Sequence, residues 1–184
     1  MVTIRLNTWV DAPVERCFRL AANVDFRNAC ARPMKIQAVS GVTHGALREG
    51  DSVTWRGWHY GLRLSLTHRI ECCRPFSHFR EVMVSGVFRY YEHDLHFAVM
   101  DDGTRVRDEV RFAAPLGPIG RVLEKLVLKR YLTSLLKLRN AALKRTAESK
   151  EWHKYLDMPV GETPVRSRPS KLTSLERGVQ GIAK

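Results

Sequence analysis

Hydrophobic and polar residues alternate along seven stretches of the first 114 residues. Alternation with a period of two places the apolar side chains of a β-strand on one face, so each stretch predicts a half-buried strand. Glycine or proline stands at most of the junctions, as expected of turns. The predicted strands are Thr3–Val10, Met34–Ser40, Asp51–His59, Leu62–Glu71, His78–Ser85, Phe88–Val99 and Thr104–Ala114.

Two short helices are predicted between the first two strands. The first has apolar residues at helical spacing, and it follows an aspartate that can cap a helix and a proline that suits the first turn. These residues are Asp11, Pro13, Val14, Cys17, Phe18 and Ala21. The second helix is predicted from Asp25 to Cys30, before Pro33.

The hydrophobic period changes after the segment PLGPIG. From Ile119 to about Thr146, apolar residues recur every three or four positions, which predicts a long amphipathic helix. Its other face is basic and is interpreted as facing solvent: Arg121, Lys125, Lys129, Arg130, Lys137, Arg139, Lys144 and Arg145. From about Ala147 the periodicity ends, so residues 1–147 are predicted to form one domain and residues 148–184 a flexible basic tail.

The turn after Val99 predicts how the last two strands pair. With Asp102 and Gly103 as a two-residue turn, Phe97 faces Asp108 and His93 faces Phe112. The residues of this face are almost all apolar and are predicted to point inward. Glu92, Asp94 and His96 fall on the other face, which is predicted to be solvated, with charge pairs across the strands.

Two further hairpins are interpreted in the same way. A turn at Tyr60 and Gly61 places Trp55 opposite Leu66 and Gly57 opposite Leu64. For the next pair of strands, a three-residue loop places Phe79 opposite His93 and Glu81 opposite Tyr91, both inward. A two-residue loop would turn that strand over, and this alternative stays open.

These elements together predict an α+β protein. A curved antiparallel sheet of about seven strands would wrap around a long C-terminal helix, with two short helices after the first strand. A wide sheet that grips one helix in this way can leave a cavity between them.

Composition narrows the choice of partners. The chain has 184 residues and a net charge of +12, which favours anionic partners. No nucleic-acid motif accompanies the charge, so nucleic acid is not expected as a partner. Because no run of about 18 apolar residues, no secretory signal and no metal-type cysteine spacing is found, we expect a cytoplasmic protein with reduced thiols.

Several segments resemble the START-like, or SRPBCC, superfamily with its Bet v 1-type helix-grip fold, and in particular its bacterial ligand-binding, polyketide cyclase-like subgroup. They include DAPVERCFRLAANVDF, LREGDSVTWRGWHYGLRL and PFSHFREVMVSGVFRYYEHDLHF. They also include DGTRVRDEVRFAAPLGPIGRVLEKL and LTSLLKLRNAAL, so the resemblance spans about Thr3 to Ala147. It implies a cavity for a hydrophobic small molecule, such as a lipid, an isoprenoid, an aromatic or a polyketide-like compound, and it implies no cofactor.

The candidate ligand-binding residues are those predicted to line this cavity. His93 is the main polar candidate, as a hydrogen-bonding group or as a general acid and base. Glu81 and Asp108 are predicted to lie inward near it. No metal site is predicted, because the other acids and histidines near His93 face away. The full set is Trp55, Leu64, Leu66, Phe79, Glu81, Tyr91, His93, Leu95, Phe97, Asp108, Val110, Phe112, Val122 and Leu126.

Binding or carriage of a hydrophobic molecule is therefore the leading hypothesis, with two alternatives. The protein could be a cyclase, aromatase or dehydratase that uses His93 as acid and base. It could also be an adaptor that contacts anionic membranes weakly, or acidic partners, through the basic helix and tail. The sequence names neither the ligand nor the oligomeric state.

Overall fold

A computed structural model describes residues 1–59, 61–115, 117, 120 and 124–156. Its main feature is a seven-stranded sheet in the order β1-β7-β6-β5-β4-β3-β2, in which every neighbouring pair is antiparallel. The strands are β1 (Val2–Val10), β2 (Gln37–Gly41), β3 (Ser52–His59), β4 (Leu62–Arg74), β5 (His78–Ser85), β6 (Tyr90–Met100) and β7 (Gly103–Ala113). The predicted curved antiparallel sheet is confirmed.

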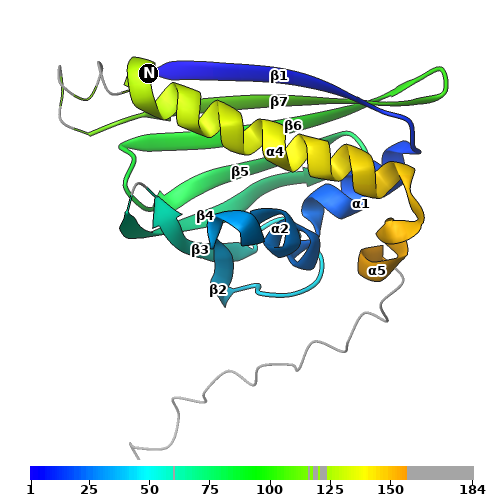
Figure 1. The fold of residues 1–184 in the computed structure, drawn as a ribbon, viewed down its shortest axis with the longest axis horizontal. Coiled ribbons are helices and arrows are strands. Elements are labelled where there is room, and N and C mark those ends of the chain that lie inside the picture. Colours follow the sequence, from blue (N-terminus) through cyan, green and yellow to red (C-terminus); the bar gives the residue numbers. More distant parts are fainter. Residues whose placement is uncertain (60, 116, 118–119, 121–123, 157–184) are drawn as a thin grey trace, which may run out of the picture.

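The helices lie on one face of the sheet (Figure 1). The long helix α4 packs along β1, and α1 and α2 contact its C-terminal half. The helical segments are α1 (Val14–Ala22), α2 (Val24–Ala31), a 3-10 turn (Arg32–Met34), a π-helical segment (Glu124–Leu128), α4 (Lys129–Glu148), a second 3-10 turn (Lys150–Trp152) and α5 (His153–Leu156). This arrangement is the predicted helix-grip fold.

The starts of the two short helices differ from each other in how they are capped. The N-cap of α1 is Pro13, and no side chain caps this helix, so the predicted capping by Asp11 is wrong. Pro13 is extended, at φ −57° and ψ 144°, and the helix can begin only after it. The next helix, α2, is capped by Asn23, whose side-chain oxygen accepts a hydrogen bond of 2.9 Å from the Phe26 N–H.

The described fold continues beyond the predicted boundary at residue 147. The residues after α4 form two short helical segments, and Trp152, Tyr155 and Leu156 pack against the core. The ring of Tyr155 lies edge-on to Phe26, with the centroids 5.4 Å apart. A segment of seven residues is too short to show a helical period, which explains why the sequence pattern did not reveal it. The remainder of the predicted tail, residues 157–184, lies outside the described residues.

The predicted pairing of β3 with β4 is confirmed, with Trp55 opposite Leu66 and Gly57 opposite Leu64. The other two hairpins are shifted by two residues. Phe97 lies opposite Val106, and Glu81 lies opposite His93. The faces are unchanged by these shifts, because side chains alternate with a period of two.

The shift in the last hairpin has a steric reason at Gly103. Gly103 is the first residue of β7 and pairs with Met100, so the turn consists of Asp101 and Asp102. A Cβ atom at position 103 would lie 2.5 Å from the carbonyl oxygen of Val10. The glycine is therefore needed where β7 passes close to the end of β1, rather than in the turn itself.

Candidate functional site

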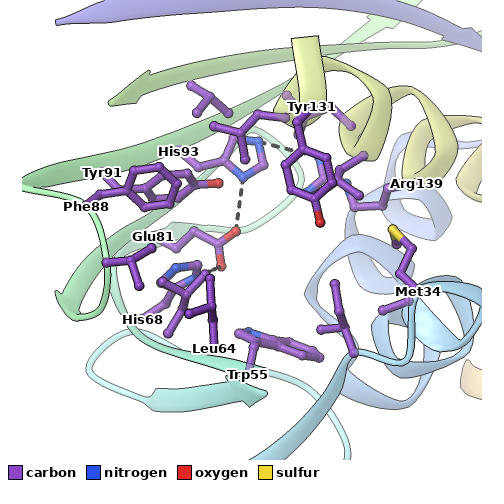
Figure 2. A pocket seen from close by; sticks show the side chains of 18 of the residues that line it. Met34, Trp55, Leu64, His68, Glu81, Phe88, Tyr91, His93, Tyr131 and Arg139 are labelled. Carbon is purple, nitrogen blue, oxygen red and sulfur yellow. Dashed lines mark hydrogen bonds and ion pairs between the residues drawn. The ribbon is translucent and has the colours of Figure 1, made fainter. Parts of the chain in front are cut away.

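A cavity of about 290 Å³ lies between the inner face of the sheet and the helices. Its wall comes from α2, from strands β3 to β7 and from α4, and most of it is apolar (Figure 2). Leu62 and Val87 belong to the wall and are 63% and 40% exposed, so the cavity opens toward solvent beside them. A void of this size is at the lower end of the range for small-molecule sites.

The structure divides the predicted lining residues into two groups. Those that line the cavity are Trp55, Leu64, Leu66, Glu81, Tyr91, His93 and Val110. Those that are buried in the core and absent from the cavity wall are Phe79, Leu95, Phe97, Asp108 and Phe112. The helix α1 fills the space above three of them, because the ring of Phe18 packs edge-on against Phe79 and Phe97, in the same cluster as Leu95.

The prediction for Leu126 is wrong, because its side chain is 69% exposed. The sequence pattern assumed one continuous α-helix, whereas Glu124–Leu128 is a π-helical segment. A π-helical turn contains more residues than an α-helical turn, so it rotates the following side chains about the helix axis. As a result Leu128, rather than Leu126, lines the cavity. Val122 lies outside the described residues.

Two charged residues of the wall were not predicted. Arg139 was assigned to the basic, solvent-facing side of the long helix, but it lines the cavity and its side chain is only 20% exposed. Arg27 comes from α2, and its side chain is 10% exposed. The further wall residues that were not predicted include His68, which the inward alternation of Leu64 and Leu66 along β4 could have revealed.

His93 lies at the polar end of the cavity, next to Glu81 (Figure 2). Asp108 lies on the other side of the His93 ring. Its Nδ1 atom is 3.0 Å from Oε1 of Glu81, and its Nε2 atom is 2.9 Å from Oδ1 of Asp108. All three side chains are at most 2% exposed. Because a carboxylate can only accept, both hydrogen bonds form together when both ring nitrogens carry hydrogen. His93 therefore links the two acids and has no nitrogen left for a ligand.

Each of these acids has further partners. Arg27 Nη2 donates to both carboxylate oxygens of Glu81, at 2.6 and 2.8 Å. Asp108 accepts from Arg139 Nη2 and, at 2.6 Å, from the side-chain amide of Asn140. The network connects α2, β5, β6, β7 and α4, so it ties both sides of the cavity together at one end.

The ionisation of the two acids follows from these contacts. Burial opposes ionisation of Asp108, but the charge of Arg139 and the bonds from His93 and Asn140 outweigh it and lower its pKa to about 2. Burial likewise opposes ionisation of Glu81, and the charge of Arg27 and the neighbouring rings of His68 and His93 hold its pKa well below the usual value. Both groups are ionised at neutral pH.

Stability is expected to fall as the pH falls from about 4 to about 2. The pKa of Asp108 is about 2 in the folded protein against 3.8 ordinarily, so in this range the unfolded chain binds more protons than the folded protein. The stabilisation from Asp108 is complete above pH 4 and is lost as the pH falls through its folded pKa, by about 2 kcal/mol. Urea unfolding at several pH values measures this, and the Asp108→Asn variant should show a shallower dependence. An equal dependence in the variant would contradict the assignment.

The outer face of β6 differs from the prediction. Glu92 and Asp94 were expected to be solvated but are 8% and 2% exposed. Arginines from the neighbouring strands cover them, with Arg80 Nε 2.7 Å and Arg111 Nη2 3.1 Å from the oxygens of Asp94. These ion pairs bury the acids on the face that points away from the cavity.

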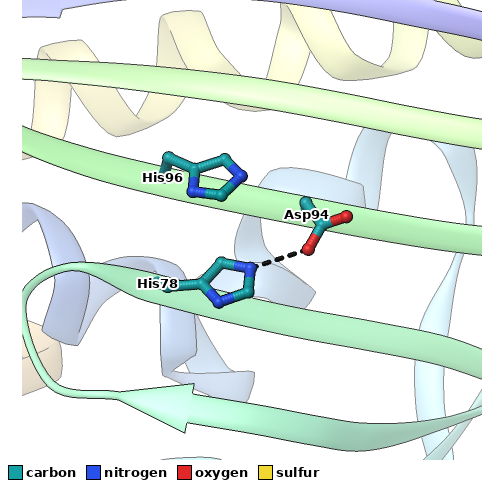
Figure 3. A group of neighbouring side chains, drawn as sticks. All are labelled: His78, Asp94 and His96. Carbon is teal, nitrogen blue, oxygen red and sulfur yellow. Dashed lines mark hydrogen bonds and ion pairs between the residues drawn. The ribbon is translucent and has the colours of Figure 1, made fainter.

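Asp94 also belongs to a cluster with two histidines (Figure 3). His78 Nε2 is 2.7 Å from Asp94 Oδ1, and the rings of His78 and His96 are stacked 4.5 Å apart. The potential ligand atoms of these three residues lie within 4.8 Å of one another. The oxygens of Asp94 already accept from two arginines, whose charges oppose a cation. We therefore interpret the cluster as part of the outer ion-pair network.

The sheet, the long helix that it grips and the cavity between them define the helix-grip fold of the START-like, or SRPBCC, proteins, as the sequence resemblance predicted. Several solved structures share this fold. No protein-family model and no curated protein matches the sequence. No helix in the described part of the chain is long and apolar enough to cross a membrane.

Three bacterial proteins illustrate this similarity. TTHA0849 from Thermus thermophilus has a TM-score of 0.59 and 22% identity, over 79% of this chain and 99% of that one. CV1439 from Chromobacterium violaceum has a TM-score of 0.61 and 15% identity, over 80% and 97%. A START superfamily protein from Mycobacterium smegmatis has a TM-score of 0.59 and 12% identity, over 79% and 97%. Identities this low demonstrate the common fold alone.

Proposed function

We propose that this protein binds and carries a hydrophobic small molecule, such as a lipid, an isoprenoid, an aromatic or a polyketide-like compound. The observation that supports it most is the cavity of about 290 Å³ with its largely apolar wall. Burial contributes about 25 cal/mol per Å² of apolar ligand surface, so enclosing roughly 200 Å² would contribute about 5 kcal/mol before the costs of association. The fold supports the same proposal, because helix-grip proteins typically bind ligands of this kind.

The contacts of His93 favour binding over catalysis. Both of its ring nitrogens lie within 3.0 Å of a carboxylate oxygen. To act as general acid or base on a ligand, the ring would have to break one of these buried bonds and take one hydrogen bond away from a buried carboxylate, which is costly. His93 therefore serves the proposed site as a structural link between Glu81 and Asp108.

Native mass spectrometry of the purified protein tests the proposal. We expect an additional mass from a co-purified apolar compound, which organic extraction removes. We also expect lipid-like compounds to raise the melting temperature of the extracted protein, because ligands that bind only the folded state stabilise it. Repeated absence of a bound compound, together with no thermal shift across a panel of lipids, isoprenoids and aromatics, would contradict the proposed function.

A further inference from the structure

Three nitrogen atoms in the cavity wall are buried and have no hydrogen-bond partner among the described residues. They are Nη1 of Arg27 and both ring nitrogens of His68. Buried polar groups in native proteins nearly always have partners, and an unpaired one costs about 1 to 3 kcal/mol. A ligand that fills this cavity must therefore bring a polar group to them or leave them unpaired.

The guanidinium of Arg27 is held in a defined orientation. Its Nη2 atom bonds both oxygens of Glu81, and the group lies over the ring of Trp55, 5.3 Å from the centroid. Its Nη1 atom is consequently positioned rather than free to seek another partner. This nitrogen can only donate, so its complement in a ligand is an acceptor.

His68 lies beside the same carboxylate. Its Nδ1 atom is 3.8 Å from Oε2 of Glu81, too far for a hydrogen bond, and its ring stacks on Tyr91 with the centroids 5.1 Å apart. Figure 2 shows His68 directly next to Glu81 in the cavity wall. Because Arg27 and His68 both adjoin Glu81, their unpaired nitrogens lie in one region of the wall.

The unpaired donor of Arg27 favours an anion as the acceptor. Among the described residues that line the cavity, Arg27 and Arg139 are cationic, and Glu81 is the only carboxylate. Asp108, behind the wall, offsets the charge of Arg139. A cationic group on the ligand can only donate, so it would leave Arg27 Nη1 unpaired. Hydrogen bonds from a guanidinium to an anionic acceptor are about twice as strong as those between neutral groups.

We propose that the ligand is amphipathic, with an apolar body in the cavity and an anionic head, of the carboxylate class, that accepts hydrogen bonds from Arg27 Nη1 and His68. This inference rests on the proposed function and specifies its ligand. In this arrangement Glu81 holds Arg27 in place, and Arg27 and His68 select the head group of the ligand.

Matched acids and alcohols test the head group. Isothermal titration calorimetry would compare decanoic acid with decan-1-ol, and 2-naphthoic acid with 2-naphthylmethanol, on the extracted full-length protein at pH 7. In at least one pair the acid is expected to bind about 10- to 100-fold more tightly than its alcohol, because the acid gains charge-assisted hydrogen bonds. Binding of 1-aminoanthracene, a neutral aromatic dye, would report the apolar cavity independently.

Three variants test which residues cause the preference for the acid over the alcohol. His68→Leu and Arg27→Lys are expected to reduce the preference for the acid to less than about threefold, because the acid loses a charge-assisted hydrogen bond and therefore loses more affinity than the alcohol. Arg27→Lys keeps a cation for Glu81 but has one terminal nitrogen in place of two. Leu64→Ala is the control, because it removes only apolar wall and should weaken the acid and the alcohol equally.

The outcomes separate this inference from the proposed function. If acid and alcohol bind equally, or only the dye binds, the anionic head is refuted and the apolar site stands. If the acid is preferred but His68→Leu and Arg27→Lys leave the preference unchanged, the assignment of these residues is refuted. If neither the dye nor any member of the two pairs binds, the proposed function fails, and the inference fails with it.

Discussion

Replacing Asp108 with alanine is expected to lower the free energy of unfolding by about 3 to 5 kcal/mol, the usual cost of removing one partner from a buried ion pair. Asp108 is fully buried and accepts from His93, Arg139 and Asn140. Without it, one nitrogen of His93 would lose its acceptor, and the guanidinium of Arg139 would exchange a carboxylate for the more distant Oδ1 of Asn140, at 3.5 Å. This cost is large compared with the total stability of about 5 to 15 kcal/mol of a typical domain.

Urea unfolding followed by circular dichroism measures this loss. Glu151→Ala is a suitable control, because Glu151 pairs with Lys154 at 3.7 Å while both side chains are more than half exposed. Exposed pairs of this kind contribute at most about 1 kcal/mol. If Asp108→Ala cost no more than the control, the buried network would not be holding the sheet to α4.

Replacing Leu64 with tryptophan is expected to weaken binding of 1-aminoanthracene at least about tenfold, because the larger ring would occupy the space meant for a ligand. Leu64 lines the cavity from β4, opposite Gly57. Enlarging a side chain in a filled core costs about 1 to 3 kcal/mol, whereas a side chain that enters an existing void displaces no neighbour. We therefore expect the free energy of unfolding to change by less than about 1 kcal/mol.

Fluorescence titration with the dye, together with thermal unfolding, measures both quantities. Leu126→Trp is the matched control, since Leu126 is 69% exposed and lies outside the cavity. This variant should bind the dye like the unchanged protein. Unaltered binding by Leu64→Trp would mean that the dye binds elsewhere, and weakened binding by Leu126→Trp would mean that this residue reaches the ligand.

The fold and the inward face of the sheet could be predicted from the sequence because they depend on local patterns. Alternation with a period of two assigned Trp55, Glu81 and His93 to the inner face, and a register error of two residues left those assignments unchanged. The change to a helical period after residue 119 likewise marked the long helix. The period of hydrophobic residues in a strand or a helix can be recognised from residues that lie close together in the sequence.

Only the tertiary structure decided which of the inward-facing residues line the cavity and could contact a ligand. Phe97 and Leu64 both point inward, but α1 covers the first and leaves a void over the second. A π-helical segment turned Leu126 outward, and Arg139 joined a buried network only because Asp108 lies across from it on β7. The period of a strand determines its face, whereas a cavity and its ion pairs depend on contacts between residues far apart in the chain, which no local pattern contains.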